Sequence, residues 1–325
     1  MNYYPDESTY TQISQEELRE LKSIPREEWM RQWREEIAPN NTDPAFGTDD
    51  YDDRHDQIPC HGETLQIKNR HGDDIRVIFY RPSGSEGKKL PMYFQLHGGG
   101  WCFGFAESSD DECVQYRDEV GCLVASINYR QAPNHPFPAG AEDCYDVIKY
   151  FVDHADEYGV DVEHMGIGGE SAGGGLSLTV CLWAAEKKEF SIKYLALIQS
   201  IPDLYNLPDL PYPDLCYHMR LIDCYCDRKA EGMSPYISAV YATDEQLQSL
   251  PERISVLTAE LDYVSITLEP FALRLAQNNR EVTVRRYPGV YHCFAVKNCP
   301  AYSEEYGPSG MDFLKRQMRK ALMED

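Results

Sequence analysis

The fold of this chain is decided by the stretch HMGIGGESAGG at residues 164–174. Residues 164–168 are typical of a buried strand, and a helical pattern begins after Ser171. Between these two elements, the pattern G-x-S-x-G places Ser171 at the corner where the strand passes into the helix. A residue at such a corner has a strained backbone, and glycines on either side prevent clashes with the neighbouring strands and the helix. The stretch therefore predicts a serine whose hydroxyl stands above the end of a sheet.

A second glycine-rich turn lies upstream, in LPMYFQLHGGGW at residues 90–101. Its apolar half predicts another buried strand, and its glycines let the backbone bring N–H groups close to a bound oxygen. Three glycines alone are equally compatible with a tight turn, but the serine corner favours the first interpretation. We predict that the N–H groups of Gly98, Gly99 and Ala172 surround a developing oxyanion, with His97 as a structural anchor of the loop.

A serine hydroxyl becomes a nucleophile when a base removes its proton, and an acid must orient that base. In this architecture the acid and then the histidine follow the serine along the chain, on loops after later strands. His292 is the last histidine of the chain and follows a predicted strand. Asp262 and Glu260 both follow the strand before it, and Asp262 is favoured because it lies farther past the strand end. Ser171, Asp262 and His292 are therefore the predicted catalytic residues.

Short apolar runs alternate with helical segments along most of the chain, which predicts an α/β fold with a mostly parallel central sheet and helices on both faces. A hairpin is expected where two strand patterns flank the polar turn NRHGD at residues 69–73. The predicted strands are residues 64–68, 75–80, 92–96, 123–128, 164–168, 194–199, 254–258 and 282–287, and an amphipathic helix over residues 311–323 closes the chain.

The chain is expected to contain a catalytic domain and a cap. Residues 1–55 are polar but contain two helical patterns and a linker, which predicts an N-terminal cap segment. Residues 56–325 are expected to form the catalytic domain, in which residues 203–235 interrupt the α/β alternation as a cap insertion. Together these segments would cover the carboxyl ends of the strands, where open α/β sheets bind their ligands.

Three tryptophans are candidates for the wall of a substrate pocket. Trp29 and Trp33 share one face of a predicted N-terminal helix, and Trp101 ends the glycine loop. Each of them is equally compatible with packing against the core.

Composition excludes several classes of partner. The chain has 31 basic and 54 acidic residues and a net charge of −23, which disfavours nucleic acid and anionic membrane surfaces. No apolar run approaches the roughly twenty residues of a membrane span, and the first residues do not resemble a signal peptide, so we expect a cytoplasmic protein without membrane insertion. The 11 cysteines are then expected to be thiols, and their spacing predicts no metal site. The sequence makes no prediction of the oligomeric state.

The chain resembles the hormone-sensitive lipase branch of the α/β-hydrolase fold, which includes many carboxylesterases. Besides the two glycine motifs, YRQAPNHPFPA at residues 129–139 and HCF at residues 292–294 carry the resemblance, which covers residues 60–320. It implies an α/β-hydrolase fold with a helical cap. It also implies a serine carboxylesterase that acts on small to medium acyl esters without a metal or an organic cofactor.

The chain departs from the pattern of that family in three places. Gln131 and Asn134 stand where Leu and Glu are usual, and Glu170 stands where Asp is more common. Asp262 is followed by YVS, whereas the family has Pro-Leu and soon afterwards a second Asp. The resemblance also implies a structural role for Asp143.

Two other functions stay open from the sequence. An amidase such as an arylformamidase resembles this branch in its glycine loop and triad, so the sequence does not separate amide from ester hydrolysis. The resemblance also includes the plant gibberellin receptor, which binds a ligand without hydrolysing it. That receptor lacks the catalytic histidine, whereas His292 is present here, so ester hydrolysis is the leading hypothesis.

Overall fold

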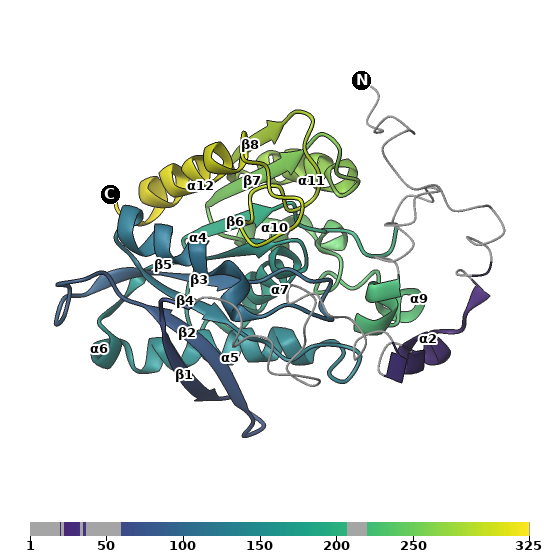
Figure 1. Ribbon diagram of the computed structural model, residues 1–325, viewed down its shortest axis with the longest axis horizontal. Helices are drawn as coiled ribbons and strands as arrows, with labels where there is room; N and C mark the ends of the chain where they lie inside the picture. Colours follow the sequence, from purple (N-terminus) through teal and green to yellow (C-terminus); the bar gives the residue numbers. More distant parts are fainter. Residues whose placement is uncertain (1–19, 21–22, 33–34, 37–59, 207–219, 325) are drawn as a thin grey trace.

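Eight strands form one central sheet in the order β1-β2-β4-β3-β5-β6-β7-β8 (Figure 1). The computed structural model describes residues 20, 23–32, 35–36, 60–206 and 220–324. β1 and β2 form the predicted hairpin, β2 pairs antiparallel with β4, and the remaining neighbours are parallel, which confirms the expected sheet. The strands are β1 (Glu63–Lys68), β2 (Asp74–Tyr80), β3 (Leu90–Leu96), β4 (Leu123–Ile127), β5 (Val160–Glu170), β6 (Tyr194–Ile198), β7 (Arg253–Ala259) and β8 (Glu281–Tyr287).

Helices cover both faces of the sheet, as predicted. Along β2, Val77 and Phe79 belong to the core on one face, and Ile78 and Tyr80 belong to the core on the other, because successive side chains of a strand point to opposite sides. Helices α5, α7 and α11 pack on the first face, and α4 and α12 pack on the second. The helices are α2 (Arg26–Gln32), α4 (Asp110–Gln115), α5 (Ala139–Asp153), α6 (Ala155–Tyr158), α7 (Ala172–Lys187), α9 (Arg228–Glu231), α10 (Asp244–Ser249), α11 (Ser265–Gln277) and α12 (Gly307–Leu322), with short 3-10 or π turns at Ala106–Ser109, Tyr116–Val120 and Ala239–Tyr241.

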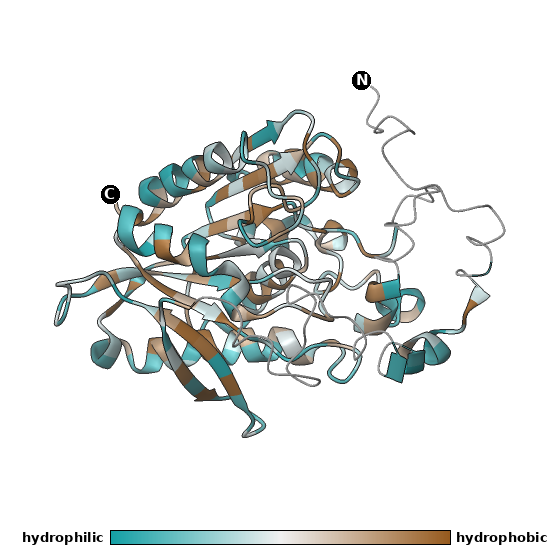
Figure 2. Cartoon of the chain, viewed as in Figure 1, coloured by the Kyte–Doolittle hydropathy of each residue, from teal (hydrophilic) through white to brown (hydrophobic). Residues whose placement is uncertain are grey.

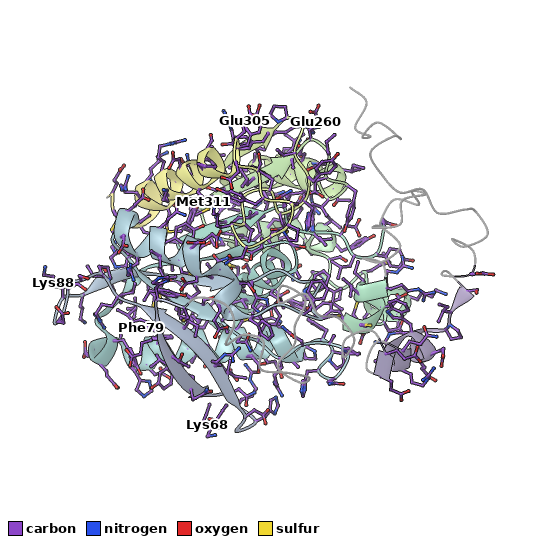
Figure 3. The ribbon with its side chains drawn as sticks, in the orientation of Figure 1. Lys68, Phe79, Lys88, Glu260, Glu305 and Met311 are labelled. Atoms are coloured by element: carbon purple, nitrogen blue, oxygen red, sulfur yellow. The ribbon has the colours of Figure 1, made fainter. Side chains whose placement is uncertain are left out.

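The closing helix has the amphipathic pattern that the sequence predicts. α12 begins earlier than expected, with Pro308 in its first turn, where a missing N–H costs nothing. Its buried side, which includes Met311 and Met318, packs on the sheet, and hydrophilic residues occupy much of its visible surface (Figure 2). Figure 3 labels Met311 on α12 and Phe79 on β2, which are both buried, and Lys68 at the outer end of β1.

The N-terminal helix contacts the predicted insertion. Trp29 of α2 is buried, and the guanidinium of Arg220 lies 5.5 Å from the centre of its ring. Arg220 also donates to the carbonyl oxygen of Ile24 at 2.8 Å, and Arg26 donates to that of Asp223 at 2.5 Å. The two expected parts of the cap are therefore joined by packing and by hydrogen bonds. The pocket candidate Trp33 and the division at residue 55 lie outside the described residues.

None of the helices in the described ranges combines the length and the apolar character that a membrane crossing requires. Among the same residues, no group of three or more His, Cys, Asp or Glu side chains is placed to hold a metal ion.

Candidate active site

Ser171 occupies the turn between β5 and α7, where the G-x-S-x-G pattern puts it. Its φ of +53° lies in the left-handed region, which costs a non-glycine residue on the order of 1–3 kcal/mol. A Cβ on either Gly169 or Gly173 would lie 2.1 Å from the carbonyl oxygen of Leu96 in β3. Glycine on both sides is therefore what allows the three elements to meet, and Ser171 is left at the N-terminus of α7.

The predicted acid and base contact each other at the carboxyl ends of β7 and β8. Nδ1 of His292 lies 2.8 Å from Oδ2 of Asp262, which is only 3% exposed. Oδ1 of Asp262 accepts the N–H of Val264 at 3.1 Å. Glu260, the other acid considered, instead accepts the N–H of Gly289 at 2.9 Å. The geometry suits an aspartate that keeps a proton on Nδ1 of the imidazole, so that Nε2 is left to act as a base.

Gln199 belongs to this constellation, although sequence reasoning missed it. It follows β6, is fully buried, and has a φ of +45°. Its Nε2 donates to Oδ2 of Asp262 at 2.7 Å and to the carbonyl oxygen of Tyr291 at 3.0 Å. Gln199 therefore fixes both the acid and the residue before the histidine. The available signal was a polar side chain at the end of an otherwise apolar strand.

The pKa of His292 is raised above its ordinary value. Burial of the ring lowers the pKa, but the negative charge of Asp262 and the hydrogen bond to it outweigh burial. The site therefore stabilises the imidazolium that forms when a base accepts a proton from serine.

The three predicted oxyanion donors differ in their hydrogen bonds. The N–H groups of Gly99 and Ala172 have no acceptor within the part of the chain that the structure describes. Gly99 has a φ of +116°, and a Cβ there would lie 2.0 Å from the carbonyl oxygen of Phe103, so only glycine fits. Gly98 differs from the expectation, because its N–H donates to Oε1 of Glu170 at 3.1 Å. Of the three predicted donors, Gly99 and Ala172 therefore keep an N–H group that bonds to no acceptor among the described residues.

Glu170 holds the glycine loop in place through its hydrogen bond with Gly98. Its Oε1 also accepts the hydroxyl of Ser109 at 3.1 Å, and its Oε2 accepts Nε2 of Gln95 at 2.8 Å. The side chain is buried, and burial raises its pKa against the opposing effect of the Gly98 hydrogen bond. The sequence marked Glu170 only as a departure from a family pattern, so this role was not predicted.

His97 anchors the loop, as predicted. Its ring stacks on Tyr129 with the ring centres 4.3 Å apart, and its Nδ1 lies 2.7 Å from the carbonyl oxygen of Gly98. The hydroxyl of Tyr129 donates to the carbonyl oxygen of His97 at 2.9 Å. Burial lowers the pKa of His97 to about 4, so the ring stays neutral near pH 7. This packing suits a structural histidine and not a second base.

Trp101 and Asp143 both have structural contacts. The ring of Trp101 is buried and stacks on Tyr225 of the insertion, with the ring centres 4.6 Å apart. These contacts hold the glycine loop against the predicted cap insertion, so they favour packing of Trp101 over the pocket role predicted for it. Asp143 is fully buried and accepts from Arg130 at 2.9 Å and from Asn69 at 2.9 Å, as a structural acid would.

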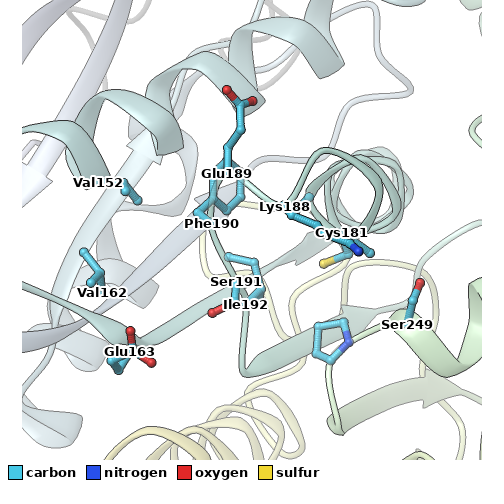
Figure 4. A pocket seen from close by; sticks show the side chains of 13 residues that line it. Val152, Val162, Glu163, Cys181, Lys188, Glu189, Phe190, Ser191, Ile192 and Ser249 are labelled. Atoms are coloured by element: carbon cyan, nitrogen blue, oxygen red, sulfur yellow. The ribbon is translucent and has the colours of Figure 1, made fainter.

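A cavity of about 460 Å³ lies at the other end of the sheet, near the amino ends of β5 and β6 (Figure 4). Val162, Cys181, Phe190 and Ile192 are among the residues that line it. It includes none of the residues described above, so it is separate from the candidate active site.

Comparison with known proteins agrees with the fold described above. Residues 93–296 match the model of a protein family whose description is alpha/beta hydrolase fold. The arylacetamide deacetylase of Bos taurus is 28% identical over 264 residues, which cover 76% of this chain and 64% of that protein. The arylesterase of Saccharolobus solfataricus is 29% identical over 248 residues, which cover 72% of this chain and 77% of that protein. Less than two thirds of the bovine relative is therefore represented here.

A solved structure has the same fold. An esterase from Pyrobaculum calidifontis superimposes with a TM-score of 0.71 and 31% sequence identity, over 82% of this chain and 87% of that one.

Proposed function

This chain belongs to the alpha/beta hydrolase fold family, and we propose that it is a serine carboxylesterase that cleaves small to medium acyl esters through an acyl-serine intermediate. The observation that carries the proposal is the hydrogen-bonded pair of Asp262 and His292, on the same edge of the sheet as Ser171 and two unpartnered amides in the described part of the chain. The arylesterase and the esterase among its relatives, each named for ester hydrolysis, support the same class. The proposal requires no metal or organic cofactor, and the cytoplasmic location stays a prediction.

In the proposed mechanism, Oγ of Ser171 attacks the carbonyl carbon of the ester while Nε2 of His292 takes the hydroxyl proton. The N–H groups of Gly99 and Ala172 hold the oxygen that becomes negative. His292 then returns the proton to the departing alcohol, and Asp262 stabilises the imidazolium in between. Water repeats the sequence on the acyl-serine and releases the carboxylic acid.

Turnover of 4-nitrophenyl acetate and butyrate by the purified chain tests this function, with the release of 4-nitrophenolate followed by its absorbance. Hydrolysis of at least one of the two esters is expected. Absence of turnover on both would contradict the proposal.

Amide hydrolysis is a second candidate, because the bovine relative is named as an arylacetamide deacetylase. The two activities share the acyl step and differ in the leaving group. 4-Nitrophenyl acetate and 4-nitroacetanilide have the same acyl group, so kcat/KM on this matched pair separates them. We expect the ester to be preferred, and an equal or higher kcat/KM on the anilide would favour the amidase.

The rate of ester hydrolysis should depend on pH through His292. Only the neutral imidazole accepts a proton, and the raised pKa keeps the ring protonated to a higher pH than usual. We therefore expect kcat/KM to rise with pH along an acid limb whose midpoint lies above 6.5. Initial rates over a buffer series, corrected for spontaneous hydrolysis, give this midpoint, and a value at or below 6.5 would argue against the assignment.

Removal of the Glu170 side chain should disturb the oxyanion loop. We expect Glu170→Ala to lower kcat by roughly ten- to a hundredfold with little change in KM, because Gly98 loses its acceptor and the neighbouring amides shift. The control is Glu170→Gln, which keeps an oxygen for the Gly98 N–H and should retain most of the activity. Thermal melting of both variants separates a general loss of folding from a loop effect, and an unchanged kcat in Glu170→Ala would contradict this role.

A further inference from the structure

A buried carboxyl group on α4 contacts the loop that begins with His292. Glu112 is only 4% exposed, and its Oε1 accepts the N–H of Lys297 at 2.8 Å. Beside this contact, the side chain of Asn298 donates to the carbonyl oxygen of Ser108 at 3.1 Å. Two hydrogen bonds therefore attach the loop after β8 to α4 and to the turn before α4.

The loop is tightly turned between its attachment at Lys297 and the catalytic base at His292. The N–H of Val296 donates to the carbonyl oxygen of Cys293 at 3.1 Å. The N–H of Cys299 donates to the carbonyl oxygen of Val296 at 3.0 Å, which makes a second turn. Because the two turns leave little slack, a movement at Lys297 is passed on to His292.

A side chain of the loop is also buried in the core. Phe294 is fully buried, and the centre of its ring lies 5.1 Å from that of Tyr287 in β8. A loop attached at Phe294 alone could rotate about that point. The second attachment, at Lys297, fixes its orientation.

The stretch of chain that holds this loop also supports the glycine loop. The hydroxyl of Ser109 donates to Oε1 of Glu170 at 3.1 Å, and the same oxygen accepts the N–H of Gly98 at 3.1 Å. The stretch is fixed to the sheet, because the hydroxyl of Ser126 in β4 donates to the carbonyl oxygen of Ala106 at 2.8 Å. The catalytic base and the glycine loop therefore share one support.

Burial of Glu112 is unfavourable for folding. Its Oε2 is buried and has no hydrogen-bond partner among the residues that the structure describes. Burial raises the pKa of Glu112 to about 8, although the hydrogen bond from the Lys297 N–H opposes this effect and the charge of Glu170 adds to it. An apolar side chain would avoid these costs, so folding alone does not account for a glutamate at this position.

We propose that Glu112 is a positioning residue for ester hydrolysis, which holds the loop after β8 so that His292 stays aligned with Ser171. This inference rests on the proposed function, in which His292 is the base. Glu112 contacts no reacting atom and acts through the N–H of Lys297. Without this acceptor, the N–H of the exposed Lys297 would turn to water, and the loop would move outward. A displacement of about 1 Å at a catalytic group can cost a hundredfold in rate.

Two variants of Glu112 test its role. We expect Glu112→Leu to lower kcat on 4-nitrophenyl acetate by roughly ten- to a hundredfold with little change in KM. Glu112→Gln should retain most of the activity, because the carboxyl is mostly protonated at pH 7 and the amide keeps an oxygen for the Lys297 N–H.

The melting temperature of Glu112→Leu should equal or exceed that of the unmodified chain, because a buried polar group is removed. A much lower melting temperature would assign Glu112 to the core and overturn the proposal. An unchanged kcat in Glu112→Leu, or a Glu112→Gln variant that is equally slow, would also overturn it.

Lys297→Pro removes the same hydrogen bond from the other side and leaves the buried side chain in place. Lys297 is the second residue of the turn from Val296 to Cys299, a position that favours proline. The matched control, Lys297→Ala, keeps the N–H and loses only the ammonium, which lies 3.5 Å from the exposed Glu304.

We expect Lys297→Pro to be as slow as Glu112→Leu, and Lys297→Ala to stay within a few-fold of the unmodified chain. The double variant Glu112→Leu, Lys297→Pro should be no slower than either single variant, because both changes remove one interaction. Equal rates in Lys297→Pro and Lys297→Ala, or losses that add in the double variant, would overturn the proposal.

Hydrogen–deuterium exchange followed by mass spectrometry reports on the loop without turnover. Peptides that cover residues 290–299 should exchange faster in Glu112→Leu than in Glu112→Gln or the unmodified chain. Unchanged exchange in Glu112→Leu would show that Glu112 does not hold the loop. Absence of ester hydrolysis by the unmodified chain would overturn the proposed function instead, so the two failures are distinguishable.

Discussion

Ser171→Ala is expected to abolish ester hydrolysis, with kcat falling on the order of 10⁶-fold, as when a serine hydrolase loses its nucleophile. The variant removes one oxygen and leaves the Cβ, so the corner between β5 and α7 keeps its sterics. Gly169 and Gly173 still leave room for the carbonyl oxygen of Leu96. The backbone N–H of residue 171 still donates to the carbonyl oxygen of Ile198 at 2.9 Å. The measurement is the steady-state rate on 4-nitrophenyl acetate, beside a circular dichroism spectrum that checks the fold.

The control for this variant is Ser177→Ala. Ser177 is also buried and lies on α7, but its hydroxyl donates to the carbonyl oxygen of Gly173 at 2.8 Å. We expect its kcat to stay within a few-fold of the unmodified chain. If Ser171→Ala hydrolysed the ester at the unmodified rate, the nucleophile would lie elsewhere.

A fluorophosphonate probe extends the same test to the ligand-binding alternative. An activated serine reacts with the probe, so the unmodified chain should take up one label at Ser171, and Ser171→Ala should take up none. Absence of the label from the unmodified chain would instead favour a protein that binds ligands of this kind without cleaving them.

The parts of the site that the sequence predicts are those with a local cause. The corner at Ser171 needs glycines on either side for steric reasons, and the five-residue pattern G-x-S-x-G shows both of them. Asp262 and His292 follow from chain order and from their positions just past strand ends. The first inference uses residues close together in the sequence, and the other two use only the order of the residues along the chain and the strand ends that they follow.

The parts that could not be predicted depend on which strands are neighbours. β3 pairs in parallel with β5, with Leu96 opposite Gly169, so the residues that follow these strands bring Gly98 and Glu170 together. Gln199 meets Asp262 for the same reason, because β6 lies beside β7. The order of the strands in the sheet cannot be seen in any short stretch of sequence. The sequence therefore predicts Gly98 as an oxyanion donor without indicating that Glu170 accepts its N–H.

Asp262→Asn is expected to lower kcat by about 10⁴-fold near neutral pH, because it imposes the wrong tautomer on His292. Oδ2 of Asp262 accepts from two donors, Nδ1 of His292 at 2.8 Å and Nε2 of Gln199 at 2.7 Å, while Oδ1 accepts the N–H of Val264. An asparagine has one oxygen and one NH₂ group, so in either orientation its NH₂ group faces a hydrogen-bond donor. That donor is the Val264 N–H in one orientation, and the His292 and Gln199 side chains in the other. With the NH₂ toward His292, Nδ1 must accept, the ring proton moves to Nε2, and Nε2 no longer accepts the proton of serine.

The charge change predicts a second result in the same variant. Loss of the negative charge leaves burial as the main influence on His292, so its pKa should fall and the acid limb of kcat/KM should move to lower pH. Glu260→Gln is the matched control, because Glu260 is exposed, and as glutamine it keeps an oxygen that can accept the N–H of Gly289. Near-normal rates in Glu260→Gln with a large loss in Asp262→Asn assign the acid to Asp262. The reverse order of losses would move that role to Glu260, and equal small losses would show that neither carboxylate orients the base.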